Sequence, residues 1–211
     1  MPAKDRKSAR KSASRPRRQA GSKNPSSRRI AKPARAAARK VAAKKPDRSS
    51  PPRNLDRALR GHLVKLLDGR SAHVPMEEVL ADFPSELRGV RPAGLPFTAW
   101  RLLEHMRIAQ WDILEFSRHA KHVSPDWPQG YWPASDAPPY ADAWDQSVLA
   151  FEADLRAMKR LVKNPSTNLA ARIPHGTGQT ILREALLIAD HNAYHLGQLV
   201  ILRRLLGVWK D

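Results

Sequence analysis

The sequence predicts an all-α protein, a four-helix bundle preceded by a disordered basic tail. Between residues 54 and 211, apolar side chains recur at helical spacing in four long segments, and no segment shows the two-residue alternation of a half-buried strand. Before residue 54 the chain is rich in Lys, Arg, Ala and Pro. The 211 residues suffice for one domain and an appendage. We therefore expect a tail over residues 1–53 and a bundle domain over residues 54–211.

The tail carries almost all of the net charge. Residues 1–53 contain 19 Lys and Arg and two acidic residues, a net charge of +17, whereas residues 54–211 contain 19 basic and 18 acidic residues, a net charge of +1. Residues 1–50 contain one Val, one Ile and no Leu or aromatic residue. Because so little apolar surface cannot offset the entropy of ordering, we predict that the tail is disordered.

Clustered cations of this kind neutralise phosphates and favour salt-sensitive, non-specific binding to nucleic acid. The segment AKPARAAARKVAAKKP (31–46) is similar in composition to the tails of linker histones. A solubilising extension, or a start codon assigned too far upstream, would give the same composition, because a run of charge alone specifies no partner.

The expected helices cover residues 54–67, 76–82, 98–119, 141–163 and 180–206. Asn54 is a suitable N-cap for the first, and Gly69 is placed to end it. Pro75 suits the first turn of the short second helix. Gly207 is well placed as the C-cap of the last.

The connection over residues 120–140 is too long for a simple turn and contains five prolines and four large aromatic residues. Loops of this length are usually packed and functional, or else disordered. Trp127, Tyr131 and Trp132 favour packing, and we expect the loop to fold over one end of the bundle. The alternative is a proline-rich segment that only adds to the core.

Polar residues fall on the stripes that should face the core. In a seven-residue projection of the last helix, within ADHNAYHLGQ (189–198), both His191 and His195 take core positions. On the helix over 98–119, His105 and Asp112 share a core position. Three imidazoles and one carboxylate thus lie on two helices that can face each other.

This pattern favours metal binding. Histidines one helical turn apart can bind one divalent ion, and a third imidazole would leave positions open for water or substrate, as in catalytic sites. With no cysteine in the chain, only His and carboxylates can hold the ion, and Zn, Ni, Mn and Fe are all candidates. Asp112 is a candidate outer-sphere partner, general base or distant ligand. Glu184, Gln198 and Tyr194 are candidates for the pocket lining. A metal-free, hydrogen-bonded histidine core is the alternative, although each unpaired buried polar group costs about 1–3 kcal/mol.

Two segments, FTAWRLLEHMRIAQWDILEFSR (97–118) and ILREALLIADHNAYHLGQLVILRRLLGVW (181–209), resemble the DinB/YfiT-like superfamily. The resemblance spans about residues 54–209. It implies an up-down-down-up bundle with a long crossing connection and a metal-binding triad formed by His105, His191 and His195. It also implies, for some relatives, thiol S-transferase or isomerase activity with a low-molecular-weight thiol such as bacillithiol, mycothiol or glutathione.

The leading hypothesis is therefore a metal-dependent enzyme acting on a small molecule, of thiol S-transferase or hydrolase type, with such a thiol as cosubstrate. A nucleic-acid-associated protein, whose tail over 1–53 binds DNA while the bundle is passive or sensing, is the alternative. No apolar stretch reaches the roughly 18 residues of a membrane span. We expect a cytoplasmic protein, nucleoid-associated if the tail binds DNA, and the bundle faces leave a homodimer open.

Overall fold

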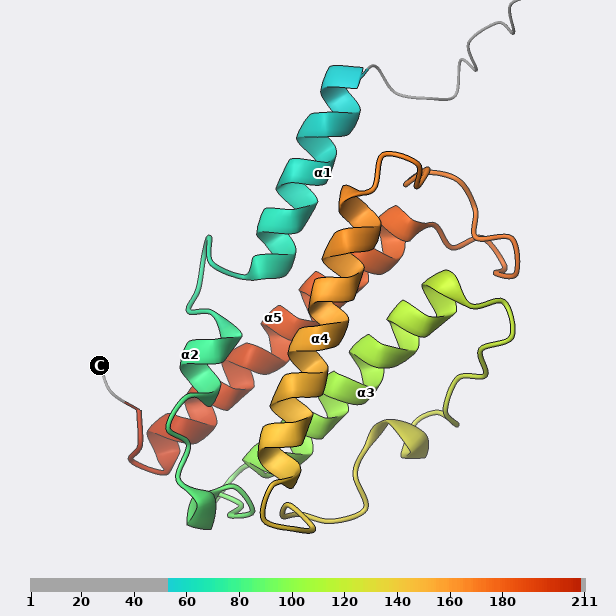
Figure 1. The fold of residues 1–211 in the computed structure, drawn as a ribbon. Helices are drawn as coiled ribbons and strands as arrows, with labels where there is room; N and C mark the ends of the chain where they lie inside the picture. The colour runs from blue at the N-terminus through green and yellow to red at the C-terminus, as the bar shows by residue number, and fades with distance from the viewer. Residues whose placement is uncertain (1–52, 210–211) are drawn as a thin grey trace, which may run out of the picture. The chain divides into compact units, whose positions relative to one another are not determined.

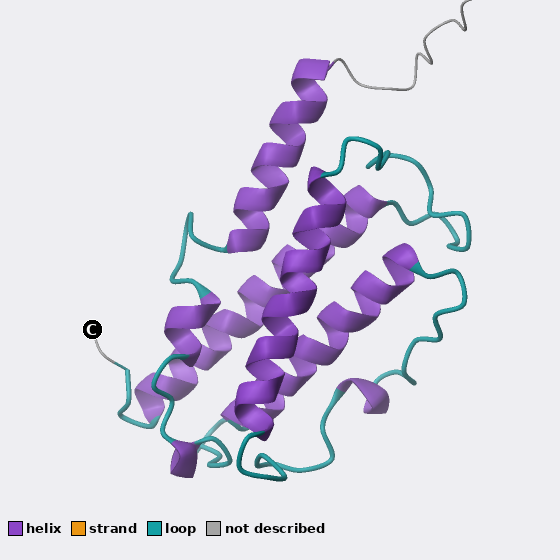
Figure 2. Ribbon diagram, viewed as in Figure 1, coloured by secondary structure: helices purple, strands orange, loops and turns teal. Residues whose placement is uncertain are grey.

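The computed structural model describes residues 53–209, so the predicted tail lies outside the described part up to residue 52. Between residues 53 and 209 the chain forms helices and loops (Figure 2), with one isolated bridge between Arg172 and Thr180. The helices are α1 (Arg53–Asp68), α2 (Met76–Leu80), η1 (Ser85–Leu87), α3 (Ala99–Arg118), η2 (Gln129–Tyr131), α4 (Ala143–Lys163) and α5 (Ile181–Leu205). This confirms the predicted all-α fold. None of the helices in the described part is long and apolar enough to cross a membrane.

Four long helices make up the bundle (Figure 1). α3 and α4 run in one direction, and α1 and α5 run in the opposite direction. α1 and α3 each pack against both α4 and α5. The order along the chain is therefore up-down-down-up, as expected, and the two parallel helices α3 and α4 need a connection that returns along the bundle.

Local sequence sets most of the helix ends. The hydroxyls of Thr98 and Thr180 each accept a hydrogen bond from the backbone N–H three residues ahead, capping α3 and α5. Gly69 and Gly207, which follow α1 and α5, adopt left-handed φ angles of 66° and 72°, as a glycine terminator should. Asn54 is not the expected cap, because α1 begins at Arg53 and Asn54 lies inside the helix.

The buried apolar residues form two clusters with polar residues between them. One cluster surrounds Trp144 and includes residues of α2, α3, α4 and α5, and the other contains Leu114 and includes α1. Between them along α3 lies Gln110, which is fully buried. Its Nε2 donates to the backbone carbonyl of Phe151 at 2.7 Å, and its Oε1 accepts from Asn192 of α5 at 2.9 Å. The middle of the bundle is therefore specified by hydrogen bonds.

Two buried arginines satisfy backbone carbonyls at the ends of helices. Arg60 of α1 donates to the carbonyls of Val162 and Asn164 at the end of α4, at 2.6 and 2.8 Å, and to that of Thr167 in the loop that follows, at 2.7 Å. Arg203 of α5 does the same for two carbonyls at the end of α2. The last carbonyls of a helix have no partner within the helix, so each guanidinium ties one helix to the end of another.

Residues 119–142, which we call the strap, join α3 to α4. Because these helices are parallel, the strap runs back along the bundle beside α3 (Figure 1) and carries the short helix η2. We had expected this segment to fold over one end of the bundle. The parallel direction of α3 and α4 explains the difference, and it brings the middle of the strap next to the middle of α3.

Candidate metal centre

Three histidines from the predicted core stripes meet in the structure. His105 comes from α3, and His191 and His195 come from α5; one ring nitrogen of each lies within 4.8 Å of the others. His105 and His195 are buried, and His191 is partly exposed. Among residues 53–209, no other group of three or more His, Cys, Asp or Glu residues is placed to hold one ion.

In His105 and His195, hydrogen bonds determine which ring nitrogen faces the other histidines. The Nδ1 of His105 lies 2.9 Å from the backbone carbonyl oxygen of Tyr131, and the Nδ1 of His195 lies 2.6 Å from Oε1 of Gln198. A carbonyl oxygen only accepts, so each Nδ1 carries the proton and donates it. Each Nε2 is left with its lone pair. Metal-binding histidines are usually held in this way, with the second nitrogen donating to a carbonyl or carboxylate.

The spacing of the ring nitrogens also fits an ion. The Nε2 atoms of His105 and His191 lie 3.1 Å apart. Two nitrogens bound to one tetrahedral zinc at 2.0–2.1 Å would lie about 3.3 Å apart. Two lone pairs this close repel each other unless a proton or a cation lies between them.

Burial favours the neutral form of all three rings. Burial, followed by the charges of His195 and His105, lowers the pKa of His191 to about 4. Burial likewise lowers the pKa of His105 and of His195 from their ordinary value. Because a metal binds the neutral imidazole, these rings need lose no proton to bind an ion at neutral pH.

Aromatic rings border two of the histidines. The indole of Trp132, from the strap, stacks on His105 with ring centroids 3.9 Å apart and an interplanar angle of 2°. Tyr194 meets His195 edge to face, with centroids 4.8 Å apart. Most of the Tyr194 side chain is exposed. Trp132 therefore restricts the His105 ring, and Tyr194 offers an accessible ring beside the cluster.

Asp112 lies outside the histidine group, although it shares a face of α3 with His105. Its Oδ2 accepts from the hydroxyl of Tyr131 at 2.6 Å, and its Oδ1 lies 2.7 Å from Nε2 of His122. Burial and the hydrogen bond to Asp112 raise the pKa of Tyr131 to about 12, so the phenol remains a donor at neutral pH. Both carboxylate oxygens are thus bonded to strap residues.

The other residues considered for the pocket lie in different surroundings. Gln198 contacts the cluster through its hydrogen bond to His195. Glu184 is fully buried and accepts from Nη1 of Arg183 at 2.9 Å. Burial raises the pKa of Glu184, and the hydrogen bond from Arg183 opposes that shift.

Sequence reasoning missed three contributors from the strap. The acceptor for His105 is the backbone of Tyr131, which no side-chain pattern can indicate. Trp132 was noted only as a packing residue, and His122 was not among the candidate residues. The concentration of aromatic residues in one proline-rich segment was the available signal, and it indicated packing without naming the partner.

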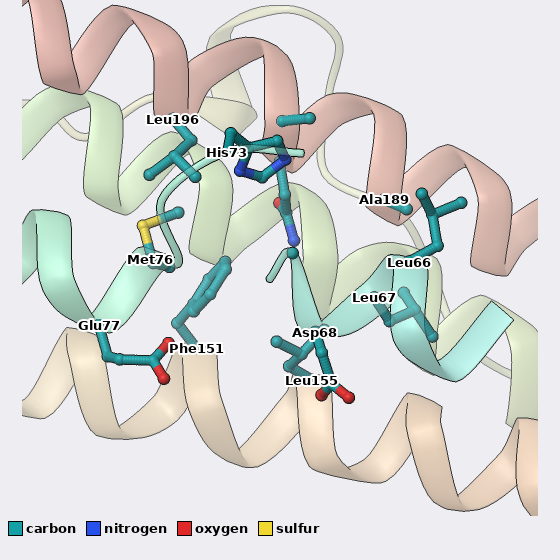
Figure 3. A pocket seen from close by; sticks show the side chains of 13 residues that line it. Leu66, Leu67, Asp68, His73, Met76, Glu77, Phe151, Leu155, Ala189 and Leu196 are labelled. Carbon is teal, nitrogen blue, oxygen red and sulfur yellow. The ribbon is translucent and has the colours of Figure 1, made fainter. Parts of the chain in front are cut away.

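A separate small cavity lies among residues of α1, α2, α4 and α5 (Figure 3). Its volume is about 50 Å³, which is room for a few water molecules. Leu67, Met76, Phe151 and Leu196 are among its lining residues, and none of the three histidines lines it. We assign it no part in the candidate centre.

The fold and the site together define the class of protein: an all-helical bundle in which α3 and α5 bring three imidazoles close together. The chain belongs to the DinB superfamily, whose sequence profile matches residues 72–199. This match covers more than half of the chain and includes all three histidines and the strap. It confirms the resemblance seen in the sequence. No curated protein and no solved structure matched the chain.

Proposed function

We propose that this protein binds one divalent metal ion through His105, His191 and His195. The observation that carries the proposal is the convergence of three ring nitrogens within 4.8 Å. Two of the three rings are held with Nε2 unprotonated by hydrogen bonds at Nδ1, and burial favours the neutral form of all of them. In the metal-free alternative, Nε2–H of His191 would donate to Nε2 of His105 across the same 3.1 Å, and metal analysis separates the two.

Three protein ligands favour a catalytic role over a structural one, because structural zinc sites normally close with four. When bound, the ion would act as a Lewis acid that lowers the pKa of a water or thiol in its open position. His105, His191 and His195 would hold it, and Trp132 would keep solvent from one face of His105. The candidate ions are Zn, Ni, Mn and Fe, since imidazole accepts all of them.

On this basis we propose a metal-dependent enzyme of thiol S-transferase or hydrolase type, acting on a small molecule in the cytoplasm. The superfamily assignment supports a metal site, and three nitrogen ligands are suited to activating a low-molecular-weight thiol. Assaying a panel of such thiols with an electrophilic substrate tests the reaction class. Turnover that needs both thiol and metal supports the transferase, and turnover with water alone supports the hydrolase.

Metal analysis tests the site directly. The full chain, purified without a histidine tag, is expected to carry about one equivalent of a divalent metal. His191→Ala and His195→Ala are each expected to lose most of it. His62→Ala, at an exposed position on α1, is the matched control and should keep the wild-type content. Equal metal content in all four proteins would rule out the proposed site.

The alternative proposal is that residues 1–53 bind nucleic acid through the phosphate backbone. It rests on the net charge of +17 in this segment against +1 in the rest of the chain. Full-length protein should bind duplex DNA with an affinity that falls steeply with salt. A chain truncated to begin at Asn54 should lose that binding, and equal affinity of the two proteins would exclude the tail as the binding element.

A further inference from the structure

Several side chains of α3 contact the strap, among them His105, Arg101 and Asp112, and Asp112 contacts it at two points. Asp112 accepts from the Tyr131 hydroxyl at 2.6 Å and pairs with His122 at 2.7 Å. His122 lies near the start of the strap and Tyr131 near its middle. Asp112, Tyr131 and His122 are all at least partly buried, so these hydrogen bonds compete less with water than surface ones do. Asp112 therefore holds two separate points of the strap.

Tyr131 contacts α3 at two levels. Its hydroxyl reaches Asp112, and its backbone carbonyl accepts from Nδ1 of His105, seven residues earlier in the helix. Seven residues are two helical turns, about 10 Å along the axis. One residue of the strap thus joins the carboxylate to the imidazole. Trp132, the next residue, stacks on the same imidazole.

We propose that Asp112 is a positioning residue for the metal centre, acting on His105 through Tyr131. By holding the Tyr131 side chain, Asp112 places the Tyr131 carbonyl where it accepts from Nδ1 of His105. That hydrogen bond keeps Nε2 of His105 unprotonated and directed at the other two histidines. The inference rests on the proposed metal site and assigns Asp112 neither a ligand role nor a proton-transfer role.

The geometry favours positioning over the alternatives considered for Asp112. Both carboxylate oxygens already have partners in Tyr131 and His122. Asp112 is also not a member of the histidine group that can share an ion. Removing a hydrogen-bond partner of a metal-binding histidine typically lowers metal affinity 10–100-fold. The partner of His105 is the backbone carbonyl of Tyr131, which no side-chain substitution removes. The hydrogen bond between Tyr131 and Asp112, which holds that carbonyl in place, can be removed by substitution.

The test is the affinity of the full chain for Co²⁺ and Zn²⁺, measured by competition with a chelator. Tyr131→Phe and Asp112→Ala should each weaken binding about tenfold or more. Asp112→Asn should stay within about threefold of wild type, because its amide oxygen can accept from Tyr131 and its NH₂ group can donate to His122. Tyr140→Phe is the matched control, since the Tyr140 hydroxyl, also in the strap, bonds to the exposed Gln146.

Amide hydrogen exchange provides a second readout. In Tyr131→Phe, exchange over residues 129–132 should speed up and should slow less on metal addition than in wild type, while α4 stays protected. The Co²⁺ absorption spectrum should change in Asp112→Ala and not in Asp112→Asn. Tyr131→Phe removes one oxygen only, so it remains informative if Asp112→Ala does not fold.

The outcomes separate the two proposals. Wild-type affinity in Tyr131→Phe and Asp112→Ala would overturn the positioning role and leave the metal site intact. A loss in Asp112→Asn as large as in Asp112→Ala would also overturn it, because the charge and not the hydrogen bonds would then be required. Absence of metal binding in the wild type would overturn the proposed function, and this inference with it.

Discussion

The Nε2 atoms of His105 and His191 lie 3.1 Å apart, although 86 positions separate the two residues in the chain. The approach depends on the antiparallel packing of α3 against α5. Each helix places its own imidazole on an inward face, and only the packed bundle makes the two nitrogens neighbours. The stability of the fold and the metal affinity of the site are therefore expected to depend on each other.

Metal binding should stabilise the folded domain. A ligand that binds only the native state at 100 times its Kd contributes about 2.7 kcal/mol, or roughly 5–10 °C in Tm for a domain of this size. Thermal unfolding followed by circular dichroism, with Zn²⁺ and with EDTA, measures the shift. His195→Ala should lose most of it, and an equal shift in wild type and variant would place the ion elsewhere.

The metal-free protein should lose stability as pH falls below about 6.5. The pKa of His191 is about 4 in the folded protein, against an ordinary value of 6.5. Between these values the unfolded chain binds a proton that the folded chain does not, so acid favours unfolding. The contribution is fully present above pH 6.5 and is lost as pH falls toward 4. Urea unfolding in EDTA at pH 7, 6 and 5 measures it, and His191→Gln should flatten the dependence.

Arg203→Ala should destabilise the protein substantially. Arg203 is 5% exposed and donates to the carbonyls of Val79 and Ala81 at 2.6 and 2.7 Å. Its removal leaves one buried and one partly buried carbonyl without this donor, at a cost of about 2–4 kcal/mol. Urea denaturation provides the value. Arg156→Ala, which breaks an exposed ion pair with Glu152, is the control and should change stability by less than about 0.5 kcal/mol. Similar values for the two would contradict the capping role.

Gln110→Leu should weaken the polar layer between the two apolar clusters. Leucine has nearly the same size but leaves the Nδ2 group of Asn192 without the acceptor it has at 2.9 Å. The expected loss is about 1–3 kcal/mol in the free energy of unfolding. Gln146→Leu, at an exposed position on α4, is the matched control. A gain in stability at position 110 would show that an apolar contact is preferred there.

Much of the fold could be predicted from local patterns. Apolar periodicity located the long helices, and Gly69 and Gly207 marked two of their ends, because left-handed backbone favours glycine wherever it occurs. The inward direction of His105, His191 and His195 followed from helical spacing. The prediction that Asn54 caps the first helix was wrong, because a residue type that favours the N-cap can also lie within the first turn of a helix.

Asp112 illustrates what local patterns could not resolve. Its place on the same stripe as His105 suggested a role in the same site, but the stripe cannot tell which strap residues reach it. The acceptor for His105 is a backbone carbonyl, and every residue has one. Its identification required the path of the strap along α3.

The sequence by itself determined the helices, the inward face of each one and the histidines on those faces, since these depend on spacing within a single segment. The tertiary structure decided which ring nitrogens meet, where the strap runs and what holds each imidazole. Those features depend on contacts between segments tens of residues apart, whose geometry is set by the packing of the whole bundle.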